Sequence, residues 1–138
     1  MQKQYFESFC REILTDNQSI RFAGIANHLG SLIVAEYRQG LVPLMTKEET
    51  SQYSIQAVLR AAIREDFESK IGRLEYSIGK YEKLIRATIP IIFRSTEAKK
   101  FYLLLSFDAD SDAKSIIDKK VLPYLAKNRE YFIQLSLS

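Results

Sequence analysis

The chain has very few of the residues that build metal sites and disulfide frameworks. Its 138 residues include one cysteine, Cys10, one histidine, His28, and no tryptophan. A lone cysteine excludes an internal disulfide and a cysteine-rich zinc site, and it suits a reducing compartment. A Ser-His-Asp triad would have to use His28, and no G-x-S-x-G motif accompanies it. We therefore interpret His28 as a solvated turn residue, and we predict no catalytic residue, no metal ligand and no cofactor.

Long hydrophobic runs are also missing. No stretch approaches the roughly 18 to 20 apolar residues that a membrane-spanning helix needs, and no apolar run of signal-peptide length follows the polar start of the chain. With 46% hydrophobic and 27% charged residues, the composition is typical of one globular domain with a real core. We expect residues 1–138 to form a single cytoplasmic domain that does not bind membranes.

The motifs that would indicate an enzyme or a calcium site are incomplete. The five glycines form neither a P-loop nor a dinucleotide fingerprint. Asp108, Asp110 and Asp112 have the spacing that opens an EF-hand loop, but Ala113 stands where glycine is needed and Lys119 where the bidentate glutamate belongs. These aspartates are therefore predicted to cap the helix that follows. The sequence favours a protein that is not an enzyme.

Positive charge is concentrated in one block. The formal net charge is only +3, yet residues 70–100 hold eight basic against three acidic residues. Such a block could meet an acidic partner, a phosphate or an anionic membrane, or could bind RNA together with its tyrosines. The favoured interpretation is a solvated face whose lysines protect an exposed strand edge, and nucleic-acid binding is disfavoured because the excess is modest. The candidate basic patch comprises Arg73, Lys80, Lys83 and Arg86.

The first part of the chain predicts a helix and a hairpin. Apolar residues recur at helical spacing over residues 3–16, which indicates an amphipathic helix. Two apolar runs, Ile20 to Ala26 and Leu32 to Tyr37, flank a turn at residues 27–30, as in a β-hairpin. Both alternate sets of side chains in the hairpin are largely apolar, so we expect helices to cover both of its faces.

A long helix is predicted from Thr46 to Ser69. Thr46 and Glu49 have the spacing of a capping box, and Gly72 ends the pattern. Its apolar residues recur at helical spacing: Tyr53, Ile55, Val58, Leu59, Ala62, Ile63 and Phe67.

Three strands and a last helix are predicted to follow. Alternation predicts a strand over Arg73 to Ile78 with a turn at Gly79 and Lys80, and a second strand over Leu84 to Ile91. Phe101 to Phe107 is apolar in both alternate sets and should lie at the centre of the sheet. Pro123 should kink or restart the final helix. The tail around Ile133 to Leu137 fits either a strand or a helical extension.

This order of elements predicts an α+β fold, α-ββ-α-βββ-α. With the two-sided strands at the centre, the simplest sheet has five antiparallel strands in the order 2-1-5-4-3, with helices on both faces. That arrangement resembles the roadblock/LC7 domain, within the profilin-like and longin-like group. The chain also resembles an uncharacterised family of small archaeal proteins through Ile20 to Gly24, Pro43 to Leu44 and Ile89 to Ile91, a likeness that implies no function.

The roadblock resemblance implies a non-catalytic homodimer. Such domains dimerise through the long central helix and the following edge strand, here Thr46 to Ser69 and Arg73 to Ile78, and often serve as scaffolds or regulators of small GTPases. The candidate dimer face is Tyr53, Arg60, Arg64 and Tyr76. The alternative is a PAS-like or profilin-like small-molecule sensor with a cavity between the sheet and the long helix. It is less favoured because PAS domains place several short helices where this chain has one long helix.

Overall fold

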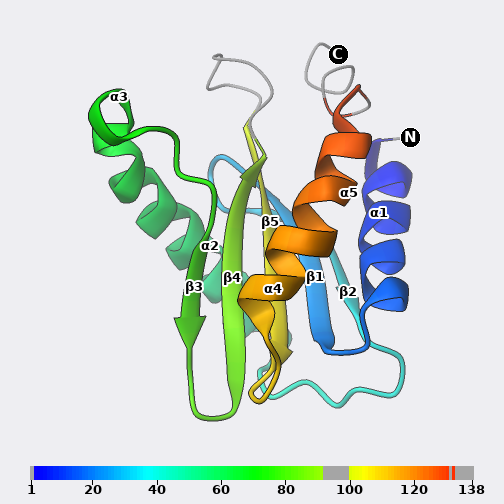
Figure 1. Ribbon diagram of the computed structural model, residues 1–138. Helices are drawn as coiled ribbons and strands as arrows, with labels where there is room; N and C mark the ends of the chain where they lie inside the picture. The colour runs from blue at the N-terminus through cyan, green and yellow to red at the C-terminus, as the bar shows by residue number, and fades with distance from the viewer. Residues whose placement is uncertain (1, 92–99, 131, 133–138) are drawn as a thin grey trace.

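A computed structural model describes residues 2–91, 100–130 and 132. Its helices and strands follow the predicted order (Figure 1). The elements are α1 (Gln2–Asp16), β1 (Ile20–Asn27), β2 (Leu32–Tyr37), α2 (Lys47–Arg64), η1 (Glu65–Phe67), α3 (Glu68–Ile71), β3 (Ser77–Lys80), β4 (Leu84–Ile91), β5 (Phe101–Asp108), α4 (Ala113–Ile116), η3 (Ile117–Val121) and α5 (Leu122–Lys127).

The five strands form one antiparallel sheet in the order β2-β1-β5-β4-β3. This confirms the predicted α+β architecture and strand order. The central strand β5 pairs with β1 on one side and with β4 on the other. Seven of its residues, Phe101 to Phe107, are buried, which is the two-sided burial that its sequence predicts.

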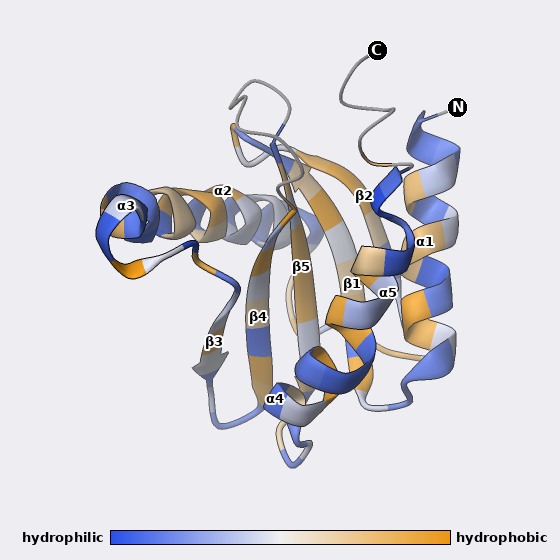
Figure 2. Ribbon diagram, turned by 45° about the horizontal axis from the view of Figure 1, so that its top comes forward, coloured by the Kyte–Doolittle hydropathy of each residue, from blue (hydrophilic) through white to orange (hydrophobic). Residues whose placement is uncertain are grey.

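Helices cover both faces of the sheet (Figures 1 and 2). On one face α1 and the segment from α4 to α5 enclose the larger core, which includes Phe6, Phe9, Leu103 and Phe132. On the other face α2 covers a smaller core in which Tyr102 and Leu104 meet the buried side of the helix. Adjacent β5 residues therefore belong to different cores, and the sheet lies between two apolar layers.

The turn between β1 and β2 is fixed from both sides. The Asn27 side-chain oxygen accepts hydrogen bonds from the backbone N–H groups of Leu29 and Ser31, at 2.9 and 3.0 Å. Gly30 has a φ of +86°, and a Cβ atom there would lie 2.6 Å from the Ile55 Cα atom of α2. The buried Ser54 hydroxyl donates to the Gly30 carbonyl oxygen at 2.7 Å. The hairpin turn is thereby joined to the long helix.

The long helix begins at the predicted capping box. The Glu49 backbone N–H donates to the Thr46 hydroxyl at 3.1 Å, and the Thr46 N–H donates to the Glu49 carboxylate at 2.8 Å. After Arg64 the helix tightens into the single turn η1 and continues as α3. Gly72, with a φ of +92°, ends it as predicted. Near the end of α2, Glu65 pairs with Lys100 and accepts from the Tyr102 hydroxyl, which fixes the helix to β5.

The predicted third strand is displaced along the chain. Alternation predicted Arg73 to Ile78, but β3 spans Ser77–Lys80, and its residues pair with β4 from Ser77↔Thr88 to Lys80↔Ile85. The predicted turn at Gly79 and Lys80 is therefore wrong, because the turn is closed later by the Tyr81 N–H donating to the Leu84 carbonyl oxygen at 2.9 Å.

The segment before β3 explains this error. The Leu74 N–H donates to the Glu68 carboxylate at 2.6 Å, and its side chain packs on the core under α2. Tyr76 instead packs on the opposite core and donates to Asp118 at 2.9 Å. Leu74 and Tyr76 therefore leave the backbone toward opposite faces, and their spacing does not reflect one side of a strand.

The last helical segment restarts at its proline, as predicted. Asp112 caps α4 by accepting from the Ser115 N–H at 3.2 Å. One π-helical stretch, η3, follows, and α5 begins beside Pro123. The prediction for the tail from Ile133 lies outside the described residues.

Candidate protein-interaction face

The long helix α2 carries two apolar stripes, and the sheet buries only one of them. The buried residues are Tyr53, Ser54, Ala57, Val58 and Ala61. The other apolar residues that recur at helical spacing are exposed: Ile55, Leu59, Ala62, Ile63 and Phe67. The small residues Ala57 and Ala61 let the helix lie close to the sheet. The larger side chains of Ile55, Leu59 and Ile63 point away from the sheet.

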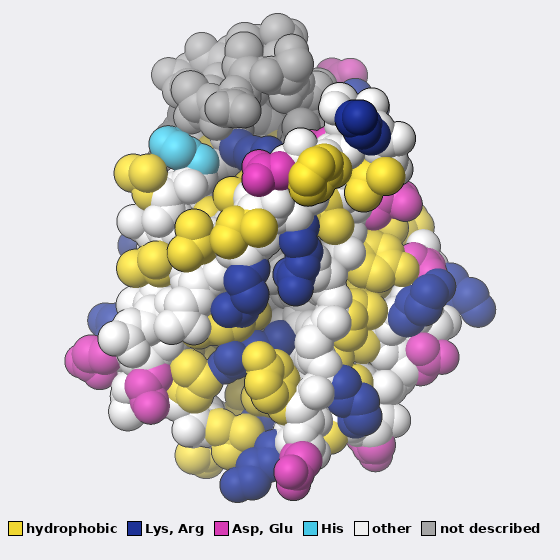
Figure 3. Space-filling model, turned by 90° about the vertical axis from the view of Figure 1, so that its left-hand side faces the viewer, with side chains coloured by type: hydrophobic (Ala, Val, Ile, Leu, Met, Phe, Trp, Pro, Cys, Tyr) yellow, Lys and Arg dark blue, Asp and Glu magenta, His cyan; other side chains and the backbone are white. Residues whose placement is uncertain are grey.

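The exposed stripe forms a continuous row. Its residues recur every fourth position and continue past the end of α2 through η1 and α3, so neighbours in the row lie one above the other while the row as a whole winds slowly around the helix axis. Their exposed fractions rise along the row, from 53% at Ile55 to 81% at Ile71. Figure 3 shows hydrophobic side chains in a row on this side of the molecule, with basic side chains beside it. This apolar row consists of Ile55, Leu59, Ile63, Phe67 and Ile71.

An open sheet edge lies next to the apolar row. Among the described residues, β3 pairs with β4 only, so its other side has unpaired backbone groups. Ile78 on this strand is 39% exposed, and Tyr81 in the following turn is 53% exposed. Large exposed apolar surfaces and open edges both mark interaction sites. We call the apolar row together with the β3 edge the interaction face.

A groove with three arginines separates α2 from the β3–β4 hairpin. Its cavity has a volume of about 270 Å³. The Arg86 guanidinium carbon lies 3.7 Å from the centre of the Tyr53 ring and 5.6 Å from that of Tyr81, so the cation is held against aromatic faces. Burial raises the pKa of Tyr53, and the nearby Arg86 charge opposes that shift. We call this the arginine groove; the residues that define it are Tyr53, Arg60, Arg64, Tyr81 and Arg86.

The four residues predicted for the dimer face do not lie together. Arg60 and Arg64 are exposed and line the arginine groove with Tyr53, which is only 8% exposed. Tyr76 lies on the other side of the sheet, where it contacts Asp118. Sequence reasoning missed Ile55 and the rest of the apolar row. The signal was present, because two apolar stripes at helical spacing exceed what one face of a helix buries.

The candidate basic patch is dispersed. Arg73 lines a groove beside α5, whereas Arg86 lies on the α2 side of the sheet. The Lys80 ammonium donates to the Ala109 carbonyl oxygen at 2.8 Å, and Lys83 is exposed in the hairpin turn. These four cations therefore do not converge on one surface.

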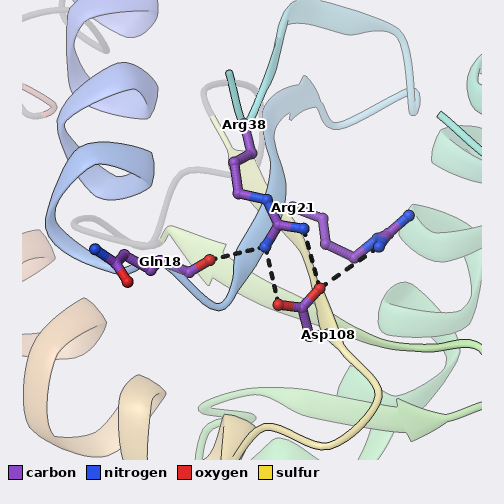
Figure 4. A network of polar contacts seen from close by, with 4 residues as sticks. All are labelled: Gln18, Arg21, Arg38 and Asp108. Atoms are coloured by element: carbon purple, nitrogen blue, oxygen red, sulfur yellow. Dashed lines mark hydrogen bonds and ion pairs between the residues drawn. The ribbon is translucent and has the colours of Figure 1, made fainter. Parts of the chain in front are cut away.

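Asp108 belongs to an ion-pair cluster that closes one end of the sheet (Figure 4). Arg38 donates to both Asp108 carboxylate oxygens, at 2.9 and 3.2 Å, and to the Gln18 carbonyl oxygen at 2.7 Å. Arg21 lies 3.5 Å from the same carboxylate. The cluster links β2, β1 and β5 and leaves Asp108 no role in an EF-hand. Within the described residues, no group of three or more metal-ligating side chains occurs.

Replacing Asp108 by asparagine should cost about 1–2 kcal/mol of unfolding free energy at neutral pH, since two hydrogen bonds to a partly exposed carboxylate lose their charge. The Arg38 hydrogen bonds hold the Asp108 pKa below its usual value in the folded state. Ionised Asp108 thus stabilises the fold above the unfolded pKa of about 3.9, and this contribution disappears as the pH falls through the lower folded value. Urea unfolding of both proteins from neutral pH to pH 3 measures the difference.

The matched control is Asp110→Asn, an exposed carboxylate two residues away that forms no ion pair within the described part of the chain. Its unfolding free energy should stay within about 0.5 kcal/mol of the parent. Equal losses in the two variants would show that the cluster contributes nothing specific.

Two further residues with potentially reactive side chains are His28 and Cys10. His28 is exposed in the hairpin turn, as predicted. Cys10 is fully buried, and burial raises the pKa of its thiol, which keeps it protonated and unreactive at neutral pH. None of the described helices is both long and apolar enough to cross a membrane.

Under the middle of α2, Tyr53, Ala57, Val58 and Ala61 pack with Phe22, Tyr102 and Leu104 of the sheet, and in the described part of the chain open space lies only at the edges of this contact. The cavity at its edge, below the loop that precedes α2, has a volume of about 50 Å³. Pockets for small organic ligands usually measure about 300–1,000 Å³. This cavity is too small for such a ligand, whereas the arginine groove, at about 270 Å³, lies just below that range.

Sheet order and helix placement define the class: the chain has a roadblock/LC7-like fold. A structure described as MglB with a tetrameric arrangement has a TM-score of 0.73 at 12% identity, over 97% of this chain and 91% of that one. MglB from Myxococcus xanthus has a TM-score of 0.71 at 12% identity, over 96% and 91% of the two chains. A roadblock/LC7 domain from Streptomyces avermitilis has a TM-score of 0.65 at 7% identity, over 91% and 95%.

At these identities the likeness concerns the fold. No protein-family model matches the chain, and no curated protein matches it.

Proposed function

We propose that residues 1–138 form one roadblock/LC7-like domain that acts as a non-catalytic protein-interaction module and pairs with a second copy of itself through the interaction face. The observation that carries this proposal is the apolar row, whose five large side chains are all at least half exposed and lie beside an open strand edge. A two-fold axis would let each row pack against the other, because the same surface then supplies both sides of the contact. The cytoplasmic location stays a prediction.

The solution mass over a concentration series tests this pairing. Light scattering after size exclusion should give about twice the chain mass of 16.0 kDa. The pairing should persist at high salt, because burial of apolar side chains is not screened by ions. A mass of one chain at every concentration would overturn the homodimer and leave the row for a different protein.

We further propose that the paired module acts as a scaffold or regulator of small GTPases. This role is supported by the roadblock/LC7-like fold and by the resemblance that the element order already suggested. It is tested by the GTP hydrolysis rates of small GTPases from the same organism, with and without the purified chain. A changed rate supports regulation, and complex formation at an unchanged rate supports a scaffold. If the chain neither changed the hydrolysis rate nor formed a complex with a small GTPase, the GTPase role would be overturned, but the proposed homodimer would not be affected.

A further inference from the structure

The arginine groove concentrates positive charge without a counterion. Arg60, Arg64 and Arg86 form no ion pair with any described carboxylate, and no aspartate or glutamate lines the groove. Arg60 and Arg64 are four residues apart on α2, a spacing at which like charges destabilise a helix. A bound anion would remove this repulsion.

Arg86 is held in place before any ligand arrives. Its guanidinium lies 3.7 Å above the Tyr53 ring, and Tyr53 is itself buried, so the planar group has a fixed orientation. Stacking occupies the faces of the guanidinium and leaves its in-plane N–H groups to bind acceptors. One of them donates to the Met45 sulfur, which is a weak acceptor. Its other donors have no hydrogen-bond acceptor among the described residues.

The chemistry of the groove fits a phosphate group. Guanidinium groups bind phosphate through paired N–H donors, and a phosphate ester carries about −1.5 to −2 charges at neutral pH, more than one carboxylate. The hydroxyl residues Ser77 and Thr88 also line the groove. Its volume of about 270 Å³ lies below the usual range for larger organic ligands, which favours a small one.

We propose that the arginine groove binds one phosphate group, either as inorganic phosphate or as the monoester of a small molecule. The groove is formed within one protomer, by α2 and the β3–β4 hairpin. All of its lining residues come from one chain, but the groove lies between the apolar row and the β3 edge, so pairing through the interaction face would bring a second copy beside it. Phosphate binding and solution mass are separate readouts, so failure of one proposal is distinguishable from failure of the other.

Titration calorimetry at constant ionic strength tests the site, with inorganic phosphate, glycerol 3-phosphate and glutamate as probes. We expect saturable binding of one phosphate per protomer and much weaker binding of glutamate. Tighter binding of glycerol 3-phosphate would identify a monoester as the ligand class, and tighter binding of inorganic phosphate would identify the free ion. Failure to saturate with either, or equal affinity for glutamate, would overturn the proposal.

The double variant Arg60→Gln/Arg64→Gln should weaken phosphate binding at least tenfold. Its matched control is Lys119→Gln/Lys120→Gln, which removes the same charge from two exposed residues of η3 on the opposite face of the sheet. The control should change the affinity by less than twofold. Equal weakening in both would show general charge attraction only and would overturn the site.

Arg86→Lys gives a second test that keeps the charge. Lysine lacks the planar donor group and the stacking on Tyr53, so phosphate affinity should fall several-fold although the net charge is unchanged. Unchanged affinity would show that the fixed guanidinium has no part in binding and would contradict the proposed geometry.

Discussion

Leu59→Lys should convert the proposed dimer into a monomer, with association of the two copies weakened by at least 100-fold, about 2.7 kcal/mol. Leu59 lies in the middle of the apolar row and is 59% exposed in the single chain. Two-fold symmetry would place a lysine from each copy in the contact, where burial of an unpaired charge is costly. The neighbouring Arg60 and Arg64 cannot compensate it, since they have the same sign. Sedimentation equilibrium measures the change.

Lysine is a good helix former, so the variant chain should keep its fold and its circular dichroism spectrum. The matched control is Leu44→Lys, the same substitution at a leucine of similar exposure, 56%, in the loop before α2 and outside the row. It should leave the dimer unchanged. If Leu59→Lys still dimerised with parental affinity, the apolar row would not be the contact between copies.

Leu104→Ala should lower the free energy of unfolding by about 2–5 kcal/mol. Leu104 is completely buried in the central strand, where it faces α2 with Tyr102 and Phe22. Truncation there removes apolar contacts and leaves a cavity that the paired strands on either side cannot easily close. Chemical denaturation at a fixed protein concentration measures the loss, because pairing would add a concentration-dependent term.

Two further leucines test the two-sided sheet. Leu103→Ala should cost a similar amount, since Leu103 is completely buried in the core under α1 and α5. Leu29→Ala, at a position that is 70% exposed in the hairpin turn, should change stability by less than about 0.5 kcal/mol. A small effect at Leu104 together with a large one at Leu103 would mean that α2 covers its face only loosely.

Local signals and two-sided burial made most of the fold predictable. The capping box at Thr46 depends on hydrogen bonds within one turn, and the hairpin turn depends on residues that are close in sequence. Contacts of this kind can be predicted from a few consecutive residues. The run from Phe101 to Phe107 is apolar on both sides of the strand, which placed β5 at the centre of the sheet. Together with the two-sided hairpin, this led to the predicted strand order.

The predictions failed where a distant contact outweighed the local pattern. Alternation at Leu74 and Tyr76 suggested a strand, but one residue packs under α2 and the other reaches Asp118 on the opposite face. The residues next to Leu74 and Tyr76 in the sequence do not show that the two side chains pack on opposite faces of the sheet. The pairing with β4 then decided where β3 begins.

The candidate site was only partly predictable for a related reason. The sequence pointed to the long helix as the candidate contact element, and the structure places Arg60 and Arg64 on its exposed side. Which of two apolar stripes faces the sheet depends on how closely the helix approaches it, and this is set by Ala57 and Ala61 against the strands. Sequence periodicity shows that two stripes exist, but the packing of the whole domain assigns their directions.

The contact between Gly30 and Ser54 constrains which residues can occupy the hairpin turn and α2. Any other residue at position 30 would meet both a strained backbone and the Ile55 Cα atom, so the hairpin turn and the middle of α2 must change together. The outward side chains further along the helix meet no such requirement in the single chain. Mutation can therefore exchange them to acquire or lose partners while the platform beneath stays the same, which is how one scaffold can give rise to many recognition specificities.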